Sequence, residues 1–384
     1  MLQIKSNSLN SGLRTPNLFE HGGNIYKIAE DLGISESRLI DFSASINPLG
    51  ISGKVKDVII GEIDNLVNYP DSDAKMLRHK IAGYNGIDPD TILCGNGSTE
   101  LIYLIPRALK PENTLIPAPT FSEYERACKI SRESRVESYE LKEENNFSII
   151  SAEFIPAIKK LSFNSELRTP NSKLSFDMAF LCNPNNPTGH LLKRDEALAI
   201  AEAARQMKCY LIVDEAFIDF VPEESLIKDV QDNPYLIVLR SMTKFYALTG
   251  LRIGYGVFHR EVIDKIKKFK EPWTVNNLAQ QAAIAAITDA EYAVETHELI
   301  KREKDFLENG FKKLNIEYRP SSVNYYLLKI PPAPKWGIIN SLREKGILVR
   351  DCSNFRGLDG SYIRVAVKSR SDNEKLLRGF SELR

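Results

Sequence analysis

A lysine in the segment SMTKFYALTGLRIGY, residues 241–255, is the side chain of this sequence best suited to covalent chemistry. Lys244 lies among small and aromatic residues, where loss of water lowers the pKa of an amine and makes it a better nucleophile toward an aldehyde. Ser241 precedes it by three residues and Arg252 follows it by eight. Because most lysines are only surface charges, this segment gains meaning from the three others that accompany it.

Two loops that follow apolar runs are suited to holding a ligand. GNGSTE at 95–100 lies between a predicted strand ending near Cys94 and a predicted helix from Glu100. Gly97, Ser98 and Thr99 would leave backbone N–H groups free for a phosphate, although an ordinary glycine-rich turn has the same composition. NPNNPTG at 183–189 follows the apolar run 178–182, and its prolines restrict the backbone that presents the amide of Asn186.

An acidic residue, Asp214 in IVDEAF at 212–217, follows a further apolar run. A partly buried carboxylate is costly without a cationic partner, unless it only caps the next helix. Taken together, the segments match one ligand. The 95–99 loop, Ser241 and Arg252 suit its phosphate, Asn186 a phenolic oxygen, Asp214 a pyridine nitrogen and Lys244 an aldehyde. That ligand is pyridoxal 5'-phosphate.

Ser241 and Lys244 also match the S-x-x-K motif of serine β-lactamases, and residues 371–373 read SDN. That SDN lies within the last fourteen residues, no KTG follows it, and the first twenty residues have no apolar segment typical of an export signal. We therefore attribute the match to chance.

The elements that must position these residues are short apolar runs separated by amphipathic stretches. The runs include 178–182, 209–213 and 235–239, and the stretch 194–207 has helical spacing. This alternation, from about 92 to 258, predicts βαβ units and one large α/β lobe with a mainly parallel sheet.

The C-terminal part of the chain has a different pattern. We expect long helix from Thr274 through Ala286 and again over 291–313, then strands at 325–330, 347–350 and 362–367. PPAP at 331–334 is expected to be a turn, and KEENN at 142–146 a solvated loop. The predicted organisation is an N-terminal extension (1–20), a segment that joins the small domain (21–50), a large domain (51–271) and a small α/β domain (272–384).

Composition excludes several classes of protein. The 384 residues carry 51 basic and 51 acidic side chains, so no basic field attracts nucleic acid or an anionic membrane. Hydrophobic residues make up 43%, enough for a large core, and no apolar run approaches the length of a membrane span. The five cysteines are far apart and form no CxxC pair, which indicates neither a disulfide framework nor a zinc site. We expect a soluble, cytoplasmic protein.

The order of phosphate loop, NPTG, D-E-A, S-x-x-K and the arginine eight residues later resembles the fold-type I aminotransferase family, over essentially the whole chain after residue 20. The resemblance implies an α/β fold-type I transferase that uses pyridoxal phosphate, with a large domain of mainly parallel sheet and a smaller α/β domain. Lys244 would carry the cofactor and Asp214 would keep its pyridine nitrogen protonated.

Within the family, the segments 21–33, 41–50, 68–74 and 214–220 resemble the threonine-phosphate decarboxylase branch. Those enzymes convert O-phospho-L-threonine to aminopropanol phosphate for the nucleotide loop of cobalamin. Histidinol-phosphate aminotransferases, the near relatives, typically have tyrosine where this chain has Phe217. The missing phenol favours the decarboxylase branch, and the aminotransferase remains the alternative.

The resemblance implies roles for further residues. Phe121 in APTF at 118–121 would stack on the cofactor ring, although core packing is the alternative. Tyr69 would reach the cofactor phosphate of a neighbouring subunit, which implies a homodimer with shared active sites. A ligand-binding regulator built on the same fold is a third reading, but the first twenty residues are too short for a DNA-binding segment.

The expected substrate is a small phosphorylated amino acid with two anionic groups. By resemblance Arg364 binds the carboxylate, while Arg350, His21 and Gly22 approach the phosphate. Ser45 lies where the decarboxylases usually have asparagine, and this departure leaves O-phospho-L-serine, which would give ethanolamine phosphate, open beside O-phospho-L-threonine. The two differ by one methyl group, worth only about 1–3 kcal/mol in a pocket.

Overall fold

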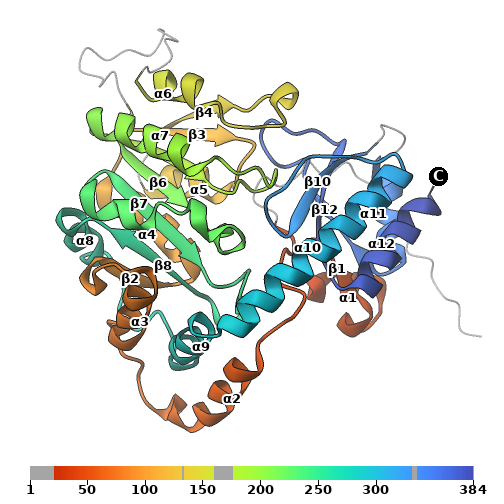
Figure 1. Cartoon of the computed structure of the whole chain (residues 1–384), viewed down its shortest axis with the longest axis horizontal. Coiled ribbons are helices and arrows are strands. Elements are labelled where there is room, and N and C mark those ends of the chain that lie inside the picture. The colour runs from red at the N-terminus through yellow and green to blue at the C-terminus, as the bar shows by residue number, and fades with distance from the viewer. Residues whose placement is uncertain (1–20, 132–133, 160–175, 331–334, 384) are drawn as a thin grey trace, which may run out of the picture.

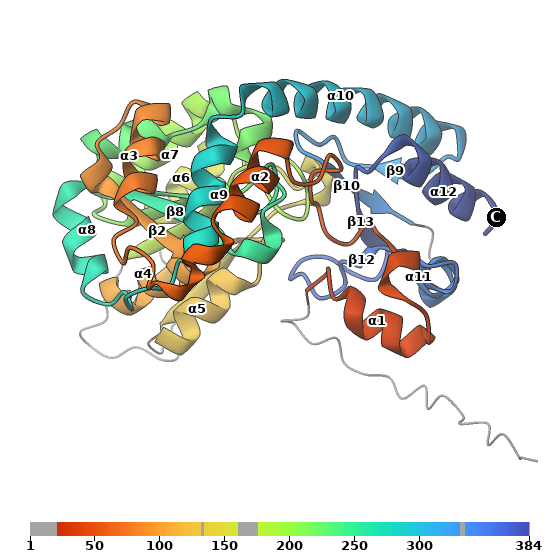
Figure 2. The same cartoon turned by 90° about the horizontal axis from the view of Figure 1, so that it is seen from below.

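The computed structural model describes residues 21–131, 134–159, 176–330 and 335–383. Within them, the chain forms a larger lobe around a seven-stranded sheet and a smaller lobe around a four-stranded and a two-stranded sheet. The long helix α10 (Ala290–Lys313) runs from the larger lobe to the smaller one, as Figures 1 and 2 show.

The seven-stranded sheet has the order β2-β8-β7-β6-β5-β3-β4. Strand β8 is antiparallel to both of its neighbours, and the other adjacent strands are parallel. The predicted α/β class with a mainly parallel sheet is therefore confirmed. The strands are β2 (Ile92–Asn96), β3 (Asn113–Ala118), β4 (Arg135–Glu140), β5 (Met178–Cys182), β6 (Tyr210–Asp214), β7 (Leu236–Ser241) and β8 (Ile253–Phe258).

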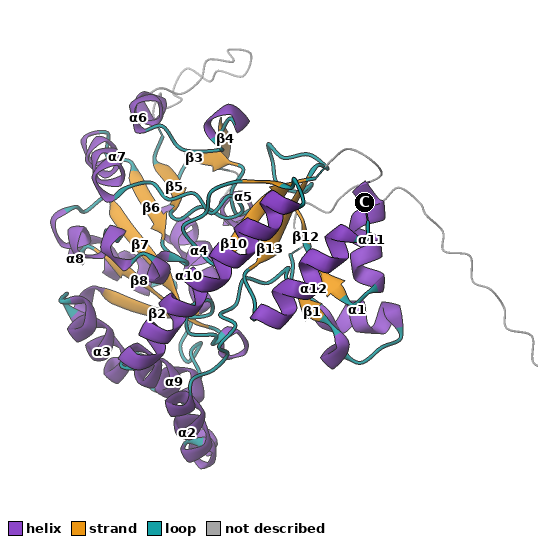
Figure 3. Ribbon diagram, turned by 45° about the vertical axis from the view of Figure 1, so that its right-hand side comes forward, coloured by secondary structure: helices purple, strands orange, loops and turns teal. Residues whose placement is uncertain are grey.

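Both faces of this sheet are buried, which is why its central strands are continuous apolar runs. Phe180 and Ile212 pack into one hydrophobic cluster, while their neighbours Leu181 and Val213 pack into the cluster on the other face. Each buried side chain of this size stabilises the fold by about 1.5–3 kcal/mol. Helices cover the two faces (Figure 3): α3 (Lys75–Asn85), α4 (Gly97–Leu109), α5 (Glu123–Ser131), α6 (Ser151–Lys159), α7 (Arg194–Gln206), α8 (Arg260–Lys267) and α9 (Asn277–Ile287).

The smaller lobe combines the two ends of the described chain. Strand β1 (Ile40–Asp41) pairs in parallel with β11 (Ile347–Leu348), so the N-terminal segment lies with the C-terminal sheets. The four-stranded sheet has the order β12-β13-β10-β9. Its strands are β9 (Glu317–Tyr318), β10 (Tyr325–Lys329), β12 (Arg350–Asp351) and β13 (Tyr362–Ala366), and the helices of this lobe are α1 (Ile25–Leu32), α11 (Lys335–Glu344) and α12 (Arg370–Ser381). Helix α2 (Gly53–Gly61) lies on the side of the larger lobe.

Helix α9 packs against α2 and α3, on the side of the larger lobe. The domain boundaries given by the sequence stay a prediction. The N-terminal extension and the PPAP segment lie outside the described residues. No helix in the described part of the chain is both long and apolar enough to cross a bilayer.

Several expected element boundaries are wrong. Helix α4 begins at Gly97 and not at Glu100, because the positive φ of Gly97 (72°) turns the chain directly from strand into helix. The strand expected at 347–350 is two short strands, since β11 pairs with β1 and β12 with β13. Helix α9 starts at Asn277, because the side chain of Asn276 caps it by accepting from Ala279 N.

The segment at 142–146, expected to be a solvated loop, contains a short 3-10 helix over Glu143–Asn145. It is tied to the smaller lobe, because the carboxylate of Glu143 pairs with Arg319 and Lys329.

Candidate active site

The candidate residues of the larger lobe meet at one edge of the sheet. The 183–189 loop, Asp214 and Lys244 lie at or beyond the carboxyl ends of the parallel strands β5, β6 and β7. Because β8 is antiparallel, its first residue is at this same edge, and Arg252 directly precedes it. Open α/β sheets bind ligands at the carboxyl ends of their parallel strands.

The N-terminal turn of α4 and the start of β8 form a cradle for an anion. Gly97 N donates to the carbonyl of Arg252 at 2.9 Å, and a Cβ on Gly97 would come within 2.6 Å of Arg252 Nη2. A Cβ on Gly254 would collide with the backbone nitrogen of Ser98. Glycine is therefore required where the two segments approach. Ser98 and Thr99 lie in the first turn of α4, where backbone N–H groups have no partner within the helix.

Ser241 ends β7 beside this cradle, and its register partner in β8 is Gly254. The Ser241 side chain is buried and its hydroxyl lies 2.8 Å from that of Thr243. Arg252 is exposed at the mouth of the cradle. The phosphate-binding group expected from the sequence is thus brought together.

Asp214 is buried at the end of β6, more deeply than the sequence indicated. Its Oδ2 accepts a 2.7 Å hydrogen bond from the hydroxyl of Tyr124, and its Oδ1 accepts from Ala216 N at 3.0 Å. Burial raises the pKa of Asp214 to about 6, although the Tyr124 hydrogen bond opposes the shift. A carboxylate in this state is suited to holding a cationic nitrogen.

Lys244 follows β7 and its side chain is only partly exposed. Burial lowers its pKa to about 8, and the positive charges of Arg364 and Arg252 act in the same direction. Asp41 and Asp214 oppose the shift. More of the amine is therefore unprotonated near neutral pH than in an ordinary lysine, and the unprotonated form is the one that attacks an aldehyde.

Phe121 lies half-buried beyond the end of β3, with its ring 5.6 Å from Tyr124 and 5.5 Å from His21. It thus connects the residue that holds Asp214 to the N-terminal segment. These contacts are compatible with a ring that stacks on a ligand, which stays a prediction.

Arg364 of β13 reaches from the smaller lobe to the larger one. Nη1 donates to Asn186 Oδ1, Nη2 donates to the carbonyl of Ser43 at 2.8 Å, and the guanidinium lies over the ring of Tyr325 at 5.1 Å. Its buried Nε has no hydrogen-bond partner among the described residues. The guanidinium is therefore fixed in place and still has donor capacity.

Arg350 of β12 is the direct register partner of Arg364 in β13. Its Nη2 donates to Asn354 Oδ1 at 2.8 Å, and its guanidinium lies over the ring of Phe355 at 5.2 Å. Two buried cations at opposed positions repel each other, so the arrangement favours a bound anion.

The N-terminal segment closes over Ser43, whose carbonyl binds Arg364. Gly23 N donates to Ser43 Oγ at 2.8 Å, and a Cβ on Gly22 would lie 2.7 Å from the Ser43 carbonyl oxygen. His21 Nε2 lies 2.8 Å from Glu123 Oε1. Ser45, in the same stretch as Ser43, is 1% exposed, and its hydroxyl has no hydrogen-bond partner among the described residues.

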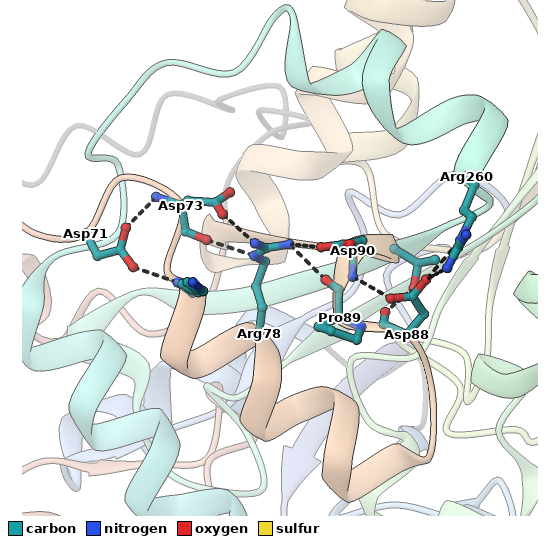
Figure 4. A network of polar contacts seen from close by, with 9 residues as sticks. Asp71, Asp73, Arg78, Asp88, Pro89, Asp90 and Arg260 are labelled. Carbon is teal, nitrogen blue, oxygen red and sulfur yellow. Dashed lines mark hydrogen bonds and ion pairs between the residues drawn. The ribbon is translucent and has the colours of Figure 1, made fainter.

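Tyr69 is not brought to the other candidates by any contact within the described part of the chain. It is 83% exposed, and its ring lies 5.1 Å from that of Trp273. The loop that follows it is rigidly held, as Figure 4 shows: Arg78 donates to the carbonyls of Asp73 (3.0 Å) and Pro89 (2.9 Å). Tyr69 is thus displayed to solvent on a fixed loop.

Sequence reasoning missed several residues of this site. The most important is Tyr124, the second residue of α5, which lies three residues after Phe121 in the chain. A second is Asn185, in the 183–189 loop, which accepts from Thr120 Oγ1 and donates to the carbonyl of Pro119. Both depend on contacts between segments distant in sequence, which no local pattern reveals.

The residues present fit pyridoxal phosphate. The glycine-lined cradle at Gly97 and Gly254 suits its phosphate, the buried Asp214 its pyridine nitrogen, and Lys244 its aldehyde. Asn186, half-buried beside Arg364, is available to its phenolic oxygen. No described cluster of histidine, cysteine or carboxylate side chains has the arrangement of a metal site.

Comparisons with known proteins agree with this geometry. The family model of class I and II aminotransferases matches residues 37–380. A threonine-phosphate decarboxylase from Salmonella typhimurium is 38% identical over 365 residues, which are 93% of this chain and 94% of the relative. The adenosylcobalamin biosynthesis bifunctional protein CobDQ of Leptospira interrogans is 33% identical over 96% of this chain and 41% of that longer relative.

Among solved structures, a histidinol-phosphate aminotransferase from Clostridium acetobutylicum has a TM-score of 0.80 at 32% identity. The match covers 90% of this chain and 99% of that one. The candidate residues from Ser45 to Arg364 fall inside the stretch that the family model matches, whereas His21 and Gly22 precede it.

Proposed function

This chain belongs to the class I and II aminotransferase family, and on that premise we propose that it is a pyridoxal-phosphate-dependent decarboxylase. Its substrate is O-phospho-L-threonine or O-phospho-L-serine, and its product is aminopropanol phosphate or ethanolamine phosphate for the nucleotide loop of a cobamide. The similarity to the Salmonella decarboxylase and to the Leptospira cobalamin-synthesis protein supports this assignment.

The observation that carries the proposal is a pair of opposed arginines, one of which lies close enough to the lysine to affect its pKa. Arg350 and Arg364 are register partners, and the charge of Arg364 lowers the pKa of Lys244. A substrate with two anionic groups can present one of them to each guanidinium. Arg364 takes the carboxylate and Arg350 the phosphate, with His21 and Gly22 near the phosphate.

When bound, the cofactor supplies an electron sink for the pair of electrons released at Cα. Asp214 holds its pyridine nitrogen protonated, and Ser98, Thr99, Ser241 and Arg252 hold its phosphate. Arg364, fixed by Asn186 and the Ser43 carbonyl, orients the substrate carboxylate. Lys244 Nζ, with a pKa of about 8, can accept and return the proton that replaces the carboxylate on Cα.

Phe217 supports decarboxylation over transamination. It is buried, and its ring meets that of Tyr325 edge to face at 5.0 Å. It offers no hydroxyl to the cofactor, where aminotransferases of the histidinol-phosphate type have a phenol. That aminotransferase activity is the second candidate, favoured by the Clostridium structure.

Product analysis separates the two activities. The cofactor-loaded protein is incubated with O-phospho-L-threonine or with O-phospho-L-serine without any oxo acid, and with histidinol phosphate plus 2-oxoglutarate. We expect CO2 and an amino-alcohol phosphate from the first or second incubation. Turnover in the third alone would establish the aminotransferase, because only transamination needs an oxo-acid acceptor.

We also infer that the protein is a homodimer with shared sites, since an unusual number of apolar side chains are exposed around Tyr69. Monomeric proteins seldom expose contiguous apolar patches larger than a few hundred Å². The exposed side chains lie on α2, the following 3-10 turn (Ile63–Val67), the loop after that turn, α3 and the segment before α9: Ile60, Ile63, Leu66, Val67, Tyr69, Met76 and Trp273.

Sedimentation of a Val67→Glu variant tests the dimer. The charge should shift the protein toward monomer and weaken cofactor retention, because Tyr69 would no longer reach the partner's phosphate site. Ile130→Glu, an equally drastic change at an exposed site on α5, is the control. A wild-type protein that is monomeric at every concentration would rule the dimer out. A cytoplasmic location, without nucleic-acid or membrane partners, stays a prediction from composition.

A further inference from the structure

A buried carboxylate, Glu123, holds the histidine of the N-terminal segment. Glu123 is only 4% exposed, although it lies in the first turn of α5 two residues after Phe121. Its Oε1 lies 2.8 Å from His21 Nε2, and its Oε2 accepts from the hydroxyl of Tyr103 on α4. Arg126 lies 3.7 Å from the same carboxylate. Three elements therefore converge on one side chain.

The protonation states in this cluster determine which atom donates. Burial opposes ionisation of Glu123, but hydrogen bonds from His21 and Tyr103 hold its pKa below the ordinary value. Burial, together with Glu123, raises the pKa of Tyr103 to about 12, so its hydroxyl stays a donor. Glu123 is thus an acceptor at neutral pH, and His21 must donate to it through Nε2.

Nε2 of His21 is thereby engaged, and Nδ1 is the ring nitrogen left for a ligand. A ring with a proton on Nδ1 as well would donate one N–H to Glu123 and the other to an anion. A negative ligand close to Glu123 would be repelled by its carboxylate, and a donor ring between the two negative groups offsets that repulsion.

The backbone after His21 is fixed at its other end. Gly22 packs against Ser43, and Gly23 N donates to Ser43 Oγ. The carbonyl of Ser43 accepts from Arg364. The short segment 21–23 therefore connects Glu123 on α5 with the arginine that orients the substrate carboxylate.

We propose that Glu123 and Tyr103 are positioning residues for the phosphate end of the substrate. They hold His21 in the orientation in which it donates to the substrate phosphate, and they touch neither the cofactor nor the reacting carbon. The inference rests on the proposed function, because that function places a phosphate near His21. It goes further in assigning recognition of this phosphate to a three-residue chain, Tyr103–Glu123–His21.

The test uses cofactor-loaded Glu123→Gln, with Glu125→Gln as the matched control. Glu125 lies on the same helix and pairs with Lys129 and Arg356, away from His21. Two probes are titrated against each protein: aminopropanol phosphate, which has no carboxylate to lose, and L-threonine, which has no phosphate. Steady-state kinetics with O-phospho-L-threonine give KM and kcat separately.

We expect Glu123→Gln to weaken the binding of aminopropanol phosphate about tenfold. This is the low end of the loss seen when a metal-ligating histidine loses the partner that orients it. KM should rise by a similar factor, while kcat and L-threonine binding stay within about twofold. Tyr103→Phe should act in the same direction with a smaller effect. Glu125→Gln should bind both probes as the wild type does.

A double-mutant cycle keeps the inference falsifiable. In a His21→Ala background, Glu123→Gln should have almost no further effect, because Glu123 acts through His21. Equal losses in both backgrounds, or equal losses for both probes, would overturn the inference and leave Glu123 a merely structural residue.

The proposed function can fail separately. If the wild type binds aminopropanol phosphate but releases no CO2 from either O-phospho-L-threonine or O-phospho-L-serine, the decarboxylase assignment is wrong, while the double-mutant cycle, read by aminopropanol phosphate binding, still decides the role of Glu123. A wild type that binds no aminopropanol phosphate overturns the inference itself.

Discussion

Arg350 and Arg364 are direct register partners in the β12–β13 pair, and each is 8% exposed. Opposed like charges destabilise a sheet unless a counter-ion is present. Each guanidinium lies over an aromatic face, that of Phe355 or Tyr325, and donates to a side-chain or backbone acceptor. We propose that a ligand with two anions binds to this pair.

Substitution of each arginine should weaken the binding of a different probe. Arg364→Gln should weaken the binding of L-threonine about tenfold or more, since a hydrogen bond to a charged group contributes about 1.5–3 kcal/mol. It should leave the binding of aminopropanol phosphate unchanged. Arg350→Gln should do the reverse, so each variant is the control for the other. The opposite pattern in titrations of the cofactor-loaded protein would exchange the roles that we assign.

Asp214 makes the cofactor-free protein sensitive to pH. Burial raises its pKa from 3.8 to about 6, so the folded state binds more protons than the unfolded state between these values. Stability therefore falls as the pH rises through this window, and the loss is complete above about pH 6. The shift corresponds to about 3 kcal/mol.

Asp214→Asn should remove this dependence of stability on pH. Urea unfolding of the two cofactor-free proteins at pH 4, 5, 6 and 7 measures it as the difference between their curves. From pH 4 to pH 7, the free energy of unfolding of the variant should rise by about 3 kcal/mol relative to that of the wild type. Parallel curves would show that Asp214 does not titrate in this window.

Ser45 should bind a polar group of the substrate. Its hydroxyl is buried and has no partner among the described residues, a state that costs about 1–3 kcal/mol. Ser45→Ala should therefore stabilise the unliganded protein and raise KM for the phosphoamino acid. A variant that is more stable but has an unchanged KM would remove Ser45 from the substrate site.

Arg240 should matter for stability far more than a surface arginine does. It lies between Glu215 at 3.1 Å and Asp219 at 2.5 Å, and all three are buried. Arg240→Met leaves two buried carboxylates without a cation, at a cost of about 3–5 kcal/mol in the free energy of unfolding. Arg205→Ala, which breaks a pair of half-exposed side chains with Glu202, should cost about 1 kcal/mol or less. Equal losses in urea titrations would contradict this account.

The sequence predicted the parts of the site that are local. The apolar runs gave β5 through β7, and the motifs that follow them supplied Asn186, Asp214 and Lys244 at one edge of the sheet. It did not predict Tyr124, because the bond to Asp214 joins α5 to β6 across 90 residues of chain. The opposed arginines were predicted separately, but their register depends on a strand pairing that no spacing encodes.

The Glu123–His21 pair shows the same limit. Glu123 reads as an ordinary helix residue, and its burial results from Tyr103 on α4 and His21 from the N-terminal segment. The expected boundaries of one strand failed for a similar reason. The strand expected at 347–350 divides because its two halves pair with different strands.

Release of CO2 from carboxyl-labelled O-phospho-L-threonine, without any oxo acid, tests the central claim most directly. We expect the cofactor-loaded wild type to release one labelled CO2 for each aminopropanol phosphate formed, or to do the same with O-phospho-L-serine and ethanolamine phosphate. Lys244→Ala should release none. Unchanged release by Lys244→Ala, or turnover of neither substrate until 2-oxoglutarate is added, would contradict the account.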